Sequence, residues 1–164
     1  MTMRPRLRSL AWLGAGLLAG LAAGLAMPTV HGQAPATPAG PLPSARVTWA
    51  EAPAIKADWG ELRAHFEGET YGLGYALAAT AVIKPGQQNH PPHRHSDEEF
   101  LLVTEGSGRW HLDGKEFPAN KGDAIYAAPW VMHGITNTGD APLTWVVFKL
   151  NAKGVKPPEA PKPR

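Results

Sequence analysis

The chain has no cysteine among its 164 residues. Disulfide bonds, thiolate nucleophiles and thiolate metal ligands are therefore excluded, so any metal ion must be held by nitrogen and oxygen atoms. Patterns of helical period are also scarce, and we expect a helix only near Asp58 to His65. This lack argues against a helical bundle.

An excess of basic charge is missing from the central part of the chain, although the whole sequence has a pI near 9.0. Residues 46–150 contain nine basic side chains against thirteen acidic ones, and the remaining basic residues lie near the two ends. Nucleic-acid binding needs Lys and Arg clustered on one face. We therefore expect no nucleic-acid partner.

The N-terminus has the pattern of an export signal. Arg4, Arg6 and Arg8 precede an apolar run from Leu10 to Met27, and small residues suited to cleavage follow. We predict a signal peptide over residues 1–32, which implies a periplasmic or secreted protein. An uncleaved membrane anchor is the alternative, because the run approaches the ~20 residues that span a bilayer. The many Gly and Ala residues weaken that reading, so we expect no stable membrane insertion.

Two segments lack the apolar residues that a core requires. Residues 33–45 are rich in Pro and Ala and are predicted to be a linker, while residues 151–164 are a Pro- and Lys-rich tail. Both tails are predicted to be disordered. Residues 46–150 remain as a single domain.

Short β-competent runs alternate with Gly-rich turns throughout that domain. Asp113-Gly114 is the strongest signal for a two-residue hairpin. Many short strands with almost no helix indicate an all-β sandwich or barrel. The expected strands are 77–83, 100–103, 109–112, 124–127, 134–136 and 143–150.

Two polar clusters carry the chemistry. His93 and His95 are two residues apart, so on an extended strand both would face the same side, and Glu99 follows beyond a bend. His133 comes from a later strand. An ordinary exposed loop with two histidines is the simpler alternative, but the second cluster favours a metal site formed by His93, His95, Glu99 and His133.

Three neutral imidazoles and one carboxylate suit a divalent transition metal, with one or two coordination positions left open. Fe or Mn is favoured, and Zn, Ni or Cu is possible. Glu99 is also a candidate catalytic base. Glu98 has the opposite parity and is expected to be solvated.

The sequence from about Leu73 to Leu150 resembles a small single-domain cupin, a monocupin. The family's first motif is matched with one extra residue before the first His, and the Gly-to-His distance of the second motif is the family's. The matching residues are Gly86, His93, His95, Glu99 and Gly106 in the first motif, and Gly122, His133 and Asn137 in the second.

Three positions before His133 depart from the family's pattern or shift it. Ala128 stands where the second motif has Pro, Pro129 comes one place late, and Trp130 stands where Gly is usual. These differences concern the turn before His133 and not the ligand itself.

The resemblance implies a cupin-type jelly-roll β-barrel with a metal at one end, held by His93, His95, Glu99 and His133. It implies no single reaction. We favour a dioxygenase-like oxidoreductase acting on a small organic substrate. A redox-neutral lyase or isomerase and a non-catalytic metal or small-molecule binding module remain alternatives, and a homodimer is possible.

Other residues have weaker assignments. His90 is either a solvated loop residue or a partner of the site, and Gln87 or Gln88 is a candidate for contacting a metal-bound ligand. His111 is expected at the rim. Tyr126 and one of Trp145 and Phe148 are expected to be core residues, with the cavity wall as the alternative. Asn137 is expected to stabilise the turn after its strand.

Overall fold

The computed structural model describes residues 40–162, which belong to one compact unit. The predicted signal peptide and residues 33–39 of the predicted linker lie outside the described residues. No helix in the described part of the chain is long and apolar enough to cross a membrane.

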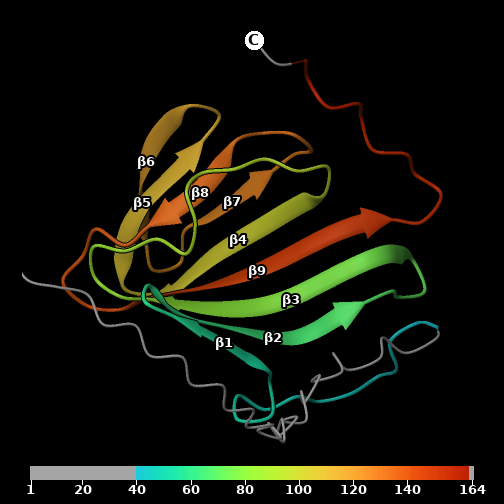
Figure 1. The fold of residues 1–164 in the computed structure, drawn as a ribbon, viewed down its shortest axis with the longest axis horizontal. Coiled ribbons are helices and arrows are strands. Elements are labelled where there is room, and N and C mark those ends of the chain that lie inside the picture. Colours follow the sequence, from blue (N-terminus) through green and yellow to red (C-terminus); the bar gives the residue numbers. More distant parts are fainter. Residues whose placement is uncertain (1–39, 163–164) are drawn as a thin grey trace, which may run out of the picture. The chain divides into compact units, whose positions relative to one another are not determined.

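The described residues form nine strands and no helix (Figure 1). The all-β prediction is therefore confirmed. In chain order the strands are β1 (Ala54–Ala57), β2 (Gly60–Gly68), β3 (Leu73–Ile83), β4 (Glu98–Glu105), β5 (Ser107–Leu112), β6 (Lys115–Asn120), β7 (Ala124–Ala127), β8 (His133–Thr136) and β9 (Leu143–Ala152).

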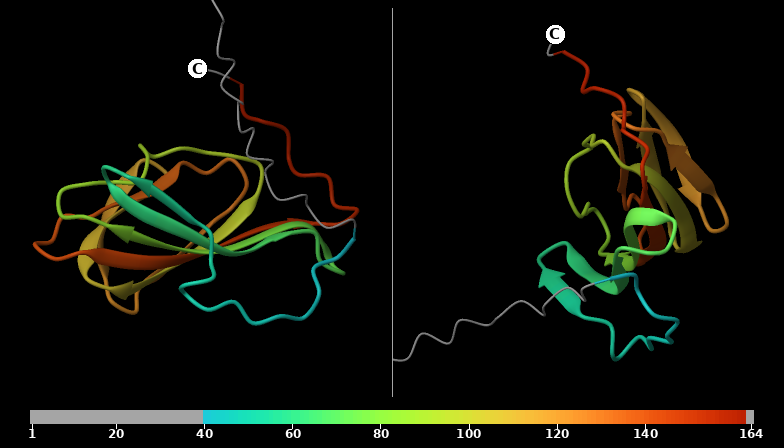
Figure 2. Two further views of the ribbon diagram at one scale, coloured as in Figure 1. Left: turned by 60° about the horizontal axis from the view of Figure 1, so that its bottom comes forward. Right: turned by 90° about the vertical axis from the view of Figure 1, so that its right-hand side faces the viewer.

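The strands form two antiparallel sheets that face each other. One sheet has six strands in the order β1-β2-β3-β9-β4-β7, and the other has three in the order β6-β5-β8. The last strand, β9, lies between β3 and β4, so the chain returns to the centre of its own sheet. Figure 2 shows the two layers from the side. This double-layered arrangement is that of a jelly roll.

Alternation along the strands creates the core between the sheets. In β4, Leu101 and Val103 are buried while Phe100 and Leu102 are exposed, which is the period-two pattern of a half-buried strand. The three-stranded sheet contributes Trp110, which is 2% exposed. The remaining core residues lie on β3, β6, β8 and β9: Ala79, Ala81, Ile83, Ala119, Ile135, Leu143, Trp145 and Val147.

The helix predicted near Asp58 to His65 is wrong. Asp58 and Trp59 lie in a turn, and the rest of the segment belongs to β2, which pairs antiparallel with β3. Leu62 and Ala64 alternate with polar residues and pair with the inward-facing Ala81 and Ala79 of β3. This long-range pairing outweighs the weak local helix preference.

The Asp113-Gly114 hairpin is confirmed. Both residues have positive φ angles, 49° and 74°, as the favoured two-residue turn requires. The partner strand β6 was not predicted, because its Lys115, Glu116 and Pro118 lower its β preference. Pro118 is tolerated because β6 is an edge strand.

Candidate metal site

The four predicted ligands come from three parts of the fold. Glu99 lies on β4 and His133 begins β8, while His93 and His95 lie in the loop between β3 and β4. The prediction that a regular strand aligns the two loop histidines is wrong. Instead, His93 forms an isolated bridge with His133, in which each backbone N–H donates to the other's carbonyl at 2.9 Å.

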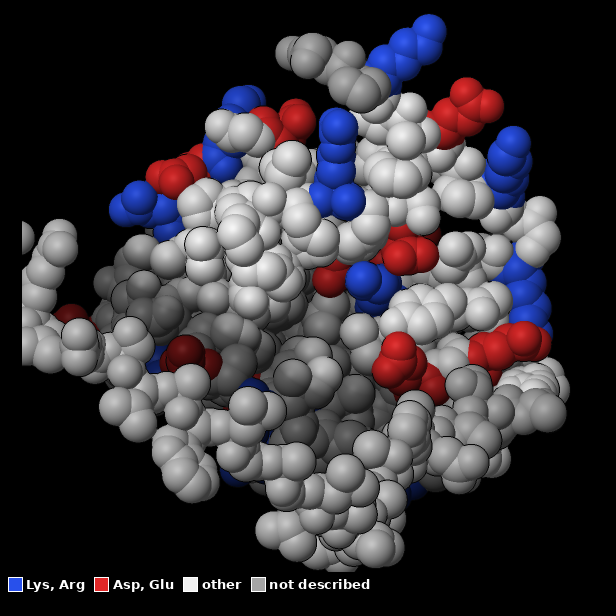
Figure 3. Space-filling view, viewed as in Figure 1, with Lys and Arg blue, Asp and Glu red and all other residues white. Residues whose placement is uncertain are grey.

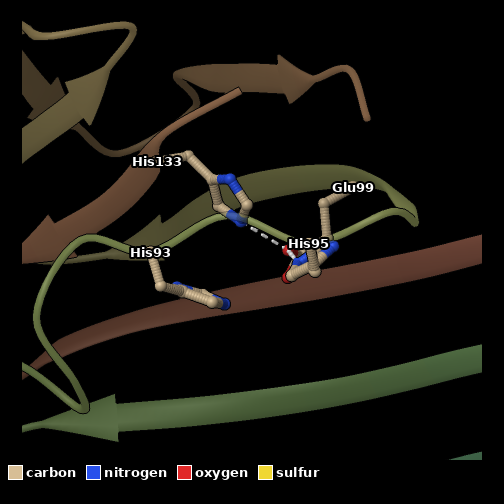
Figure 4. A group of neighbouring side chains, drawn as sticks. All are labelled: His93, His95, Glu99 and His133. Atoms are coloured by element: carbon tan, nitrogen blue, oxygen red, sulfur yellow. Dashed lines mark hydrogen bonds and ion pairs between the residues drawn. The ribbon is translucent and has the colours of Figure 1, made fainter. Parts of the chain in front are cut away.

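The four side chains nonetheless converge (Figure 4). One potential ligand atom from each of His93, His95, Glu99 and His133 lies within 4.8 Å of the other three. Glu99 Oε2 is 2.7 Å from Nε2 of His95 and 2.6 Å from Nε2 of His133. Glu99 and His133 are buried, and the two loop histidines are half-buried. The structure thus brings together the set that the sequence predicted.

The tautomer of His133 supports a cation at this point. Its Nδ1 lies 2.8 Å from the carbonyl oxygen of Val131, so Nδ1 carries the proton and donates it. In the neutral ring Nε2 then has only a lone pair, which points at the Glu99 carboxylate. Two lone pairs at that distance repel each other, so either a second proton or a metal ion must lie between them.

Charge and burial keep His93 and Glu99 in metal-binding forms. Burial, together with the charges of His90, His133 and His95, lowers the pKa of His93 to about 4, so the ring is neutral at pH 7. Burial acts to raise the pKa of Glu99. Hydrogen bonds from His133 and His95 outweigh burial and hold that pKa well below its usual range. Glu99 is therefore ionised.

Unpartnered nitrogens also fit a metal-binding role. Nδ1 of His93 and Nδ1 of His95 are buried and have no hydrogen-bond partner among the described residues. Buried polar atoms usually have a partner, so such exceptions require an explanation. A donor set of imidazole nitrogens and a carboxylate oxygen fits a divalent transition metal. The cluster is thus suited to hold one.

The turn before His133 forms although Trp130 stands where the second motif usually has Gly. The backbone of Trp130 has φ = 66°, the left-handed conformation that Gly adopts most easily. Its N–H donates to the carbonyl of His95 at 2.7 Å, and its indole Nε1 donates to the carbonyl of Pro158 at 2.7 Å. Trp130 thus links the His133 turn to the His95 loop and to the C-terminal segment.

Asn137 stabilises the turn after β8, as predicted. Its side chain is fully buried and donates to the carbonyls of Ile83 and Ala141 at 2.8 and 2.9 Å. Its Oδ1 accepts from the N–H of Gly139 at 3.0 Å. These bonds join the end of β3 to the β8–β9 connection. They therefore fix the position of β8, the strand that carries His133.

His90 lies beside the cluster without belonging to it. Its ring centroid is 4.1 Å from that of His93, and its Nδ1 is 3.0 Å from the Pro91 carbonyl oxygen. Gln88 accepts a hydrogen bond from Thr136 at 3.2 Å.

The hydroxyl of Thr136 also contacts His111 Nε2, at 3.1 Å. His111 is half-buried on β5, and its Nδ1 lies 3.3 Å from Glu116. The rim position expected for His111 fits this mixture of partial burial and surface contacts.

The aromatic residues that were candidates for the cavity wall face different sides of the six-stranded sheet. Trp145 faces the core and is 3% exposed, whereas Phe148 is 47% exposed on the outer face. Tyr126 does not reach the cavity, because it lies on the outer face and its hydroxyl donates to Glu98 at 2.6 Å. The outer rings of Phe100 and Tyr126 lie 4.8 Å apart. These exposed aromatics form an apolar row on the six-stranded sheet.

Sequence reasoning missed Lys149. It pairs with Glu99 across β4 and β9, and it has the same inward parity as Trp145 and Val147. The alternation along β9 was the signal that could have found it. Figure 3 shows other charged side chains of both signs interspersed on one face of the molecule.

Comparisons with known proteins agree with this geometry. Residues 79–149 match the family model described as the cupin domain. KdgF from Halomonas sp. has a similar solved structure, with a TM-score of 0.55, 18% identity and coverage of 68% of this chain and 97% of that one. At this identity the likeness supports the fold alone.

Two curated relatives have more similar sequences. Gentisate 1,2-dioxygenase from Streptomyces sp. is 35% identical over 79 residues, which cover 46% of this chain but only 22% of the dioxygenase. Protein SchB from Streptomyces halstedii is 29% identical over 117 residues, covering 71% of this chain and 80% of SchB. The chain thus spans a minor part of the dioxygenase and most of SchB.

Proposed function

We propose that this chain, which belongs to the cupin superfamily, is a metal-dependent oxidoreductase that acts on a small organic substrate. The observation that carries the proposal is the convergence of three imidazoles and one carboxylate from β4, β8 and the loop between β3 and β4. The partial similarity to gentisate 1,2-dioxygenase supports a dioxygenase-like reaction.

The chain's own residues would each have a defined part. His93, His95, Glu99 and His133 would hold the ion, which supplies Lewis acidity and one-electron redox chemistry when it is bound. The Val131 carbonyl orients His133 through its Nδ1–H. The inward-facing apolar residues of β3 and β9 keep bulk water from the inner side of the site.

The lowered pKa of Glu99 argues against the predicted role of this residue as a catalytic base. A carboxylate whose pKa is held far below neutral accepts protons poorly at pH 7. We therefore assign Glu99 first to metal binding and orientation of the imidazoles.

Oxygen consumption tests this function. Protein loaded separately with Fe(II), Mn(II) and Zn(II) should be mixed with phenols, dihydroxybenzoates and diketones in an oxygen-electrode cell. We expect uptake with Fe(II) or Mn(II) and none with Zn(II). Substrate conversion that continues under strict anaerobiosis with Zn(II) would instead identify a redox-neutral lyase or isomerase. Failure of every loaded form to convert any substrate would favour a binding module.

The metal itself needs a separate measurement. We propose Fe or Mn, although raw affinity at such a site follows the order Mn < Fe < Ni < Cu > Zn. Elemental analysis of protein purified from its native compartment should therefore precede any reconstitution. A preparation dominated by Zn would contradict the Fe or Mn assignment.

We also propose that the protein is exported and that it forms a homodimer. The basic N-terminus and the apolar run after it support export. The exposed side chains of Phe100, Tyr126 and Phe148 on the outer face of the six-stranded sheet support the dimer, because pairing would remove them from water.

A further inference from the structure

A lysine faces the interior beside the candidate metal site. Lys149 lies on β9, the strand between β3 and β4, and its Cα partners are Glu99 on β4 and Leu77 on β3. Inward parity on β9 is set by the buried Trp145 and Val147, and no register shift separates Val147 from Lys149. The half-buried Lys149 side chain therefore extends from the same inner surface as Glu99.

The Lys149 side chain is half-buried on the inner side of β9, in register with the candidate ligand Glu99. Yet Lys149 takes part in none of the ion pairs that the described residues form within 4.0 Å. No carboxylate of the described residues therefore lies within ion-pair distance of its ammonium group.

Three carboxylates in this part of the fold accept hydrogen bonds from groups other than Lys149. Glu67 accepts from the Tyr75 hydroxyl at 3.0 Å, and Asp97 accepts from Asn151 Nδ2 at 3.3 Å. Glu99 is held by His95 and His133. None of these carboxylates pairs with Lys149 within 4.0 Å, so its ammonium group can contact an anionic ligand.

The charge of the loaded site adds to this effect. A divalent ion with neutral imidazoles and the carboxylate of Glu99 leaves a local charge of about +1, Lys149 adds a second positive charge, and Asp97, 3.8 Å from Nδ1 of His95, offsets one of the two. An anionic substrate is therefore favoured over a neutral one of the same shape.

We propose that Lys149 is the anion-binding residue of this site and that the substrate is a small organic carboxylate. Its carboxylate group contacts the Lys149 ammonium, and a neighbouring oxygen is directed toward the histidine cluster. This inference rests on the proposed function, because it places the substrate beside the same four residues. The alternative is that Lys149 extends its ammonium group to solvent and contacts no ligand.

Binding measurements with matched ligand pairs test this assignment. Full-length protein loaded with Zn(II), which prevents turnover, should be titrated calorimetrically with 2,5-dihydroxybenzoate and with hydroquinone, which lacks the carboxylate. Pyruvate and acetone form a second pair. We expect the wild type to bind each carboxylate more tightly than its neutral counterpart.

The variant Lys149→Met keeps the length of the side chain and removes its charge. It should weaken binding of the carboxylates by roughly tenfold or more and leave hydroquinone and acetone unaffected. Lys149→Arg should retain most of the preference. Lys121→Met, at an exposed turn, is the matched control and should leave every affinity unchanged.

Each outcome has a defined meaning. Wild-type protein that binds neither carboxylate, or a Lys149→Met variant that binds both as tightly as the wild type, overturns the inference. Zinc content measured on the same samples reports the metal site separately, and Lys149→Met should keep it. Carboxylate binding that depends on Lys149 without oxygen uptake would retain the inference and contradict the oxidoreductase.

Discussion

His133 is oriented from both sides of its ring. The Val131 carbonyl fixes the proton on Nδ1, and this directs the Nε2 lone pair toward the space shared with Glu99 and His95. Hydrogen bonds of this kind hold a metal-binding imidazole in one tautomer and one rotation. The geometry of the cluster is therefore largely formed before a metal binds.

Replacing Glu99 by Gln tests the cluster with little change of shape. Loss of the carboxylate charge should reduce affinity for Zn(II) or Mn(II) by about a hundredfold, and His93→Ala with His133→Ala should abolish tight binding. Competition titration against a chromogenic chelator measures this. His111→Ala, which removes a histidine outside the cluster, should leave affinity unchanged. Retention of the ion by the double variant with wild-type affinity would contradict the site.

The contribution of His133 to stability should depend on pH in opposite ways with and without metal. In the metal-free protein the pKa of His133 is raised despite its burial, mainly by the hydrogen bond with Glu99, so its contribution is present below its unfolded pKa of about 6.5 and is lost as the pH rises through the folded value. The lowered pKa of Glu99 gives a contribution that is present above about pH 4.3 and is lost as the pH falls.

Metal binding has the reverse dependence, because protons compete with the ion for the imidazoles. The increase in melting temperature caused by Zn(II) should therefore be larger at about pH 7.5 than at about pH 5.5. Differential scanning fluorimetry with and without the ion measures it. An equal increase at both pH values would mean that the ion is bound elsewhere. The His111→Ala variant is the control.

The β7–β8 connection is the element that joins the two halves of the site. Its Trp130 donates hydrogen bonds to the carbonyls of His95 and Pro158. The buried side chain of Asn137 anchors the other end of β8 through its hydrogen bond to Ile83. His133 and the His95 loop are thus positioned by one continuous set of hydrogen bonds. A change in this turn should alter both.

Two variants of Trp130 separate backbone strain from the indole contact. Trp130→Ala and Trp130→Gly both lose the bond to Pro158, but only Ala keeps a side chain at φ = 66°. The Gly variant should therefore be more stable than the Ala variant by roughly 1 kcal/mol. Urea unfolding curves measure the difference, and Met132→Ala against Met132→Gly, at an ordinary backbone position, should show the opposite order. Equal stability of the two Trp130 variants would exclude strain.

At the scale of the whole molecule, one compact unit of two sheets brings β4, β8 and the loop between β3 and β4 together at the site. β9 is central to this arrangement because it lies between β3 and β4 and carries both the core residue Trp145 and the inward-facing Lys149. The site and the core are therefore parts of the same strand order.

Export is the prediction that belongs to the full chain. Expressed with its N-terminus intact in a Gram-negative host, the protein should appear in the periplasmic fraction with a mature N-terminus near Gln33. Intact-mass analysis of the fractionated protein gives both results. Leu18→Arg places a charge in the apolar run and should retain the unprocessed chain in the cytoplasm. An unprocessed wild-type chain in the membrane fraction would favour the anchor.

The sequence by itself determined the parts of the molecule that local patterns encode. The Asp113-Gly114 turn follows from the φ angles that only a few residues adopt easily, and His93, His95, Glu99 and His133 follow from their chemistry and spacing. Strand 124–127 follows from its apolar run between turns.

Only the tertiary structure decided the rest. Segment 60–68 is a strand because β3 supplies its pairing partner, and Trp130 keeps a positive φ because bonds to His95 and Pro158 hold it there. Lys149 becomes a neighbour of Glu99 because β9 returns between β3 and β4. Each of these depends on contacts between residues far apart in the chain, whose free energy no local pattern contains.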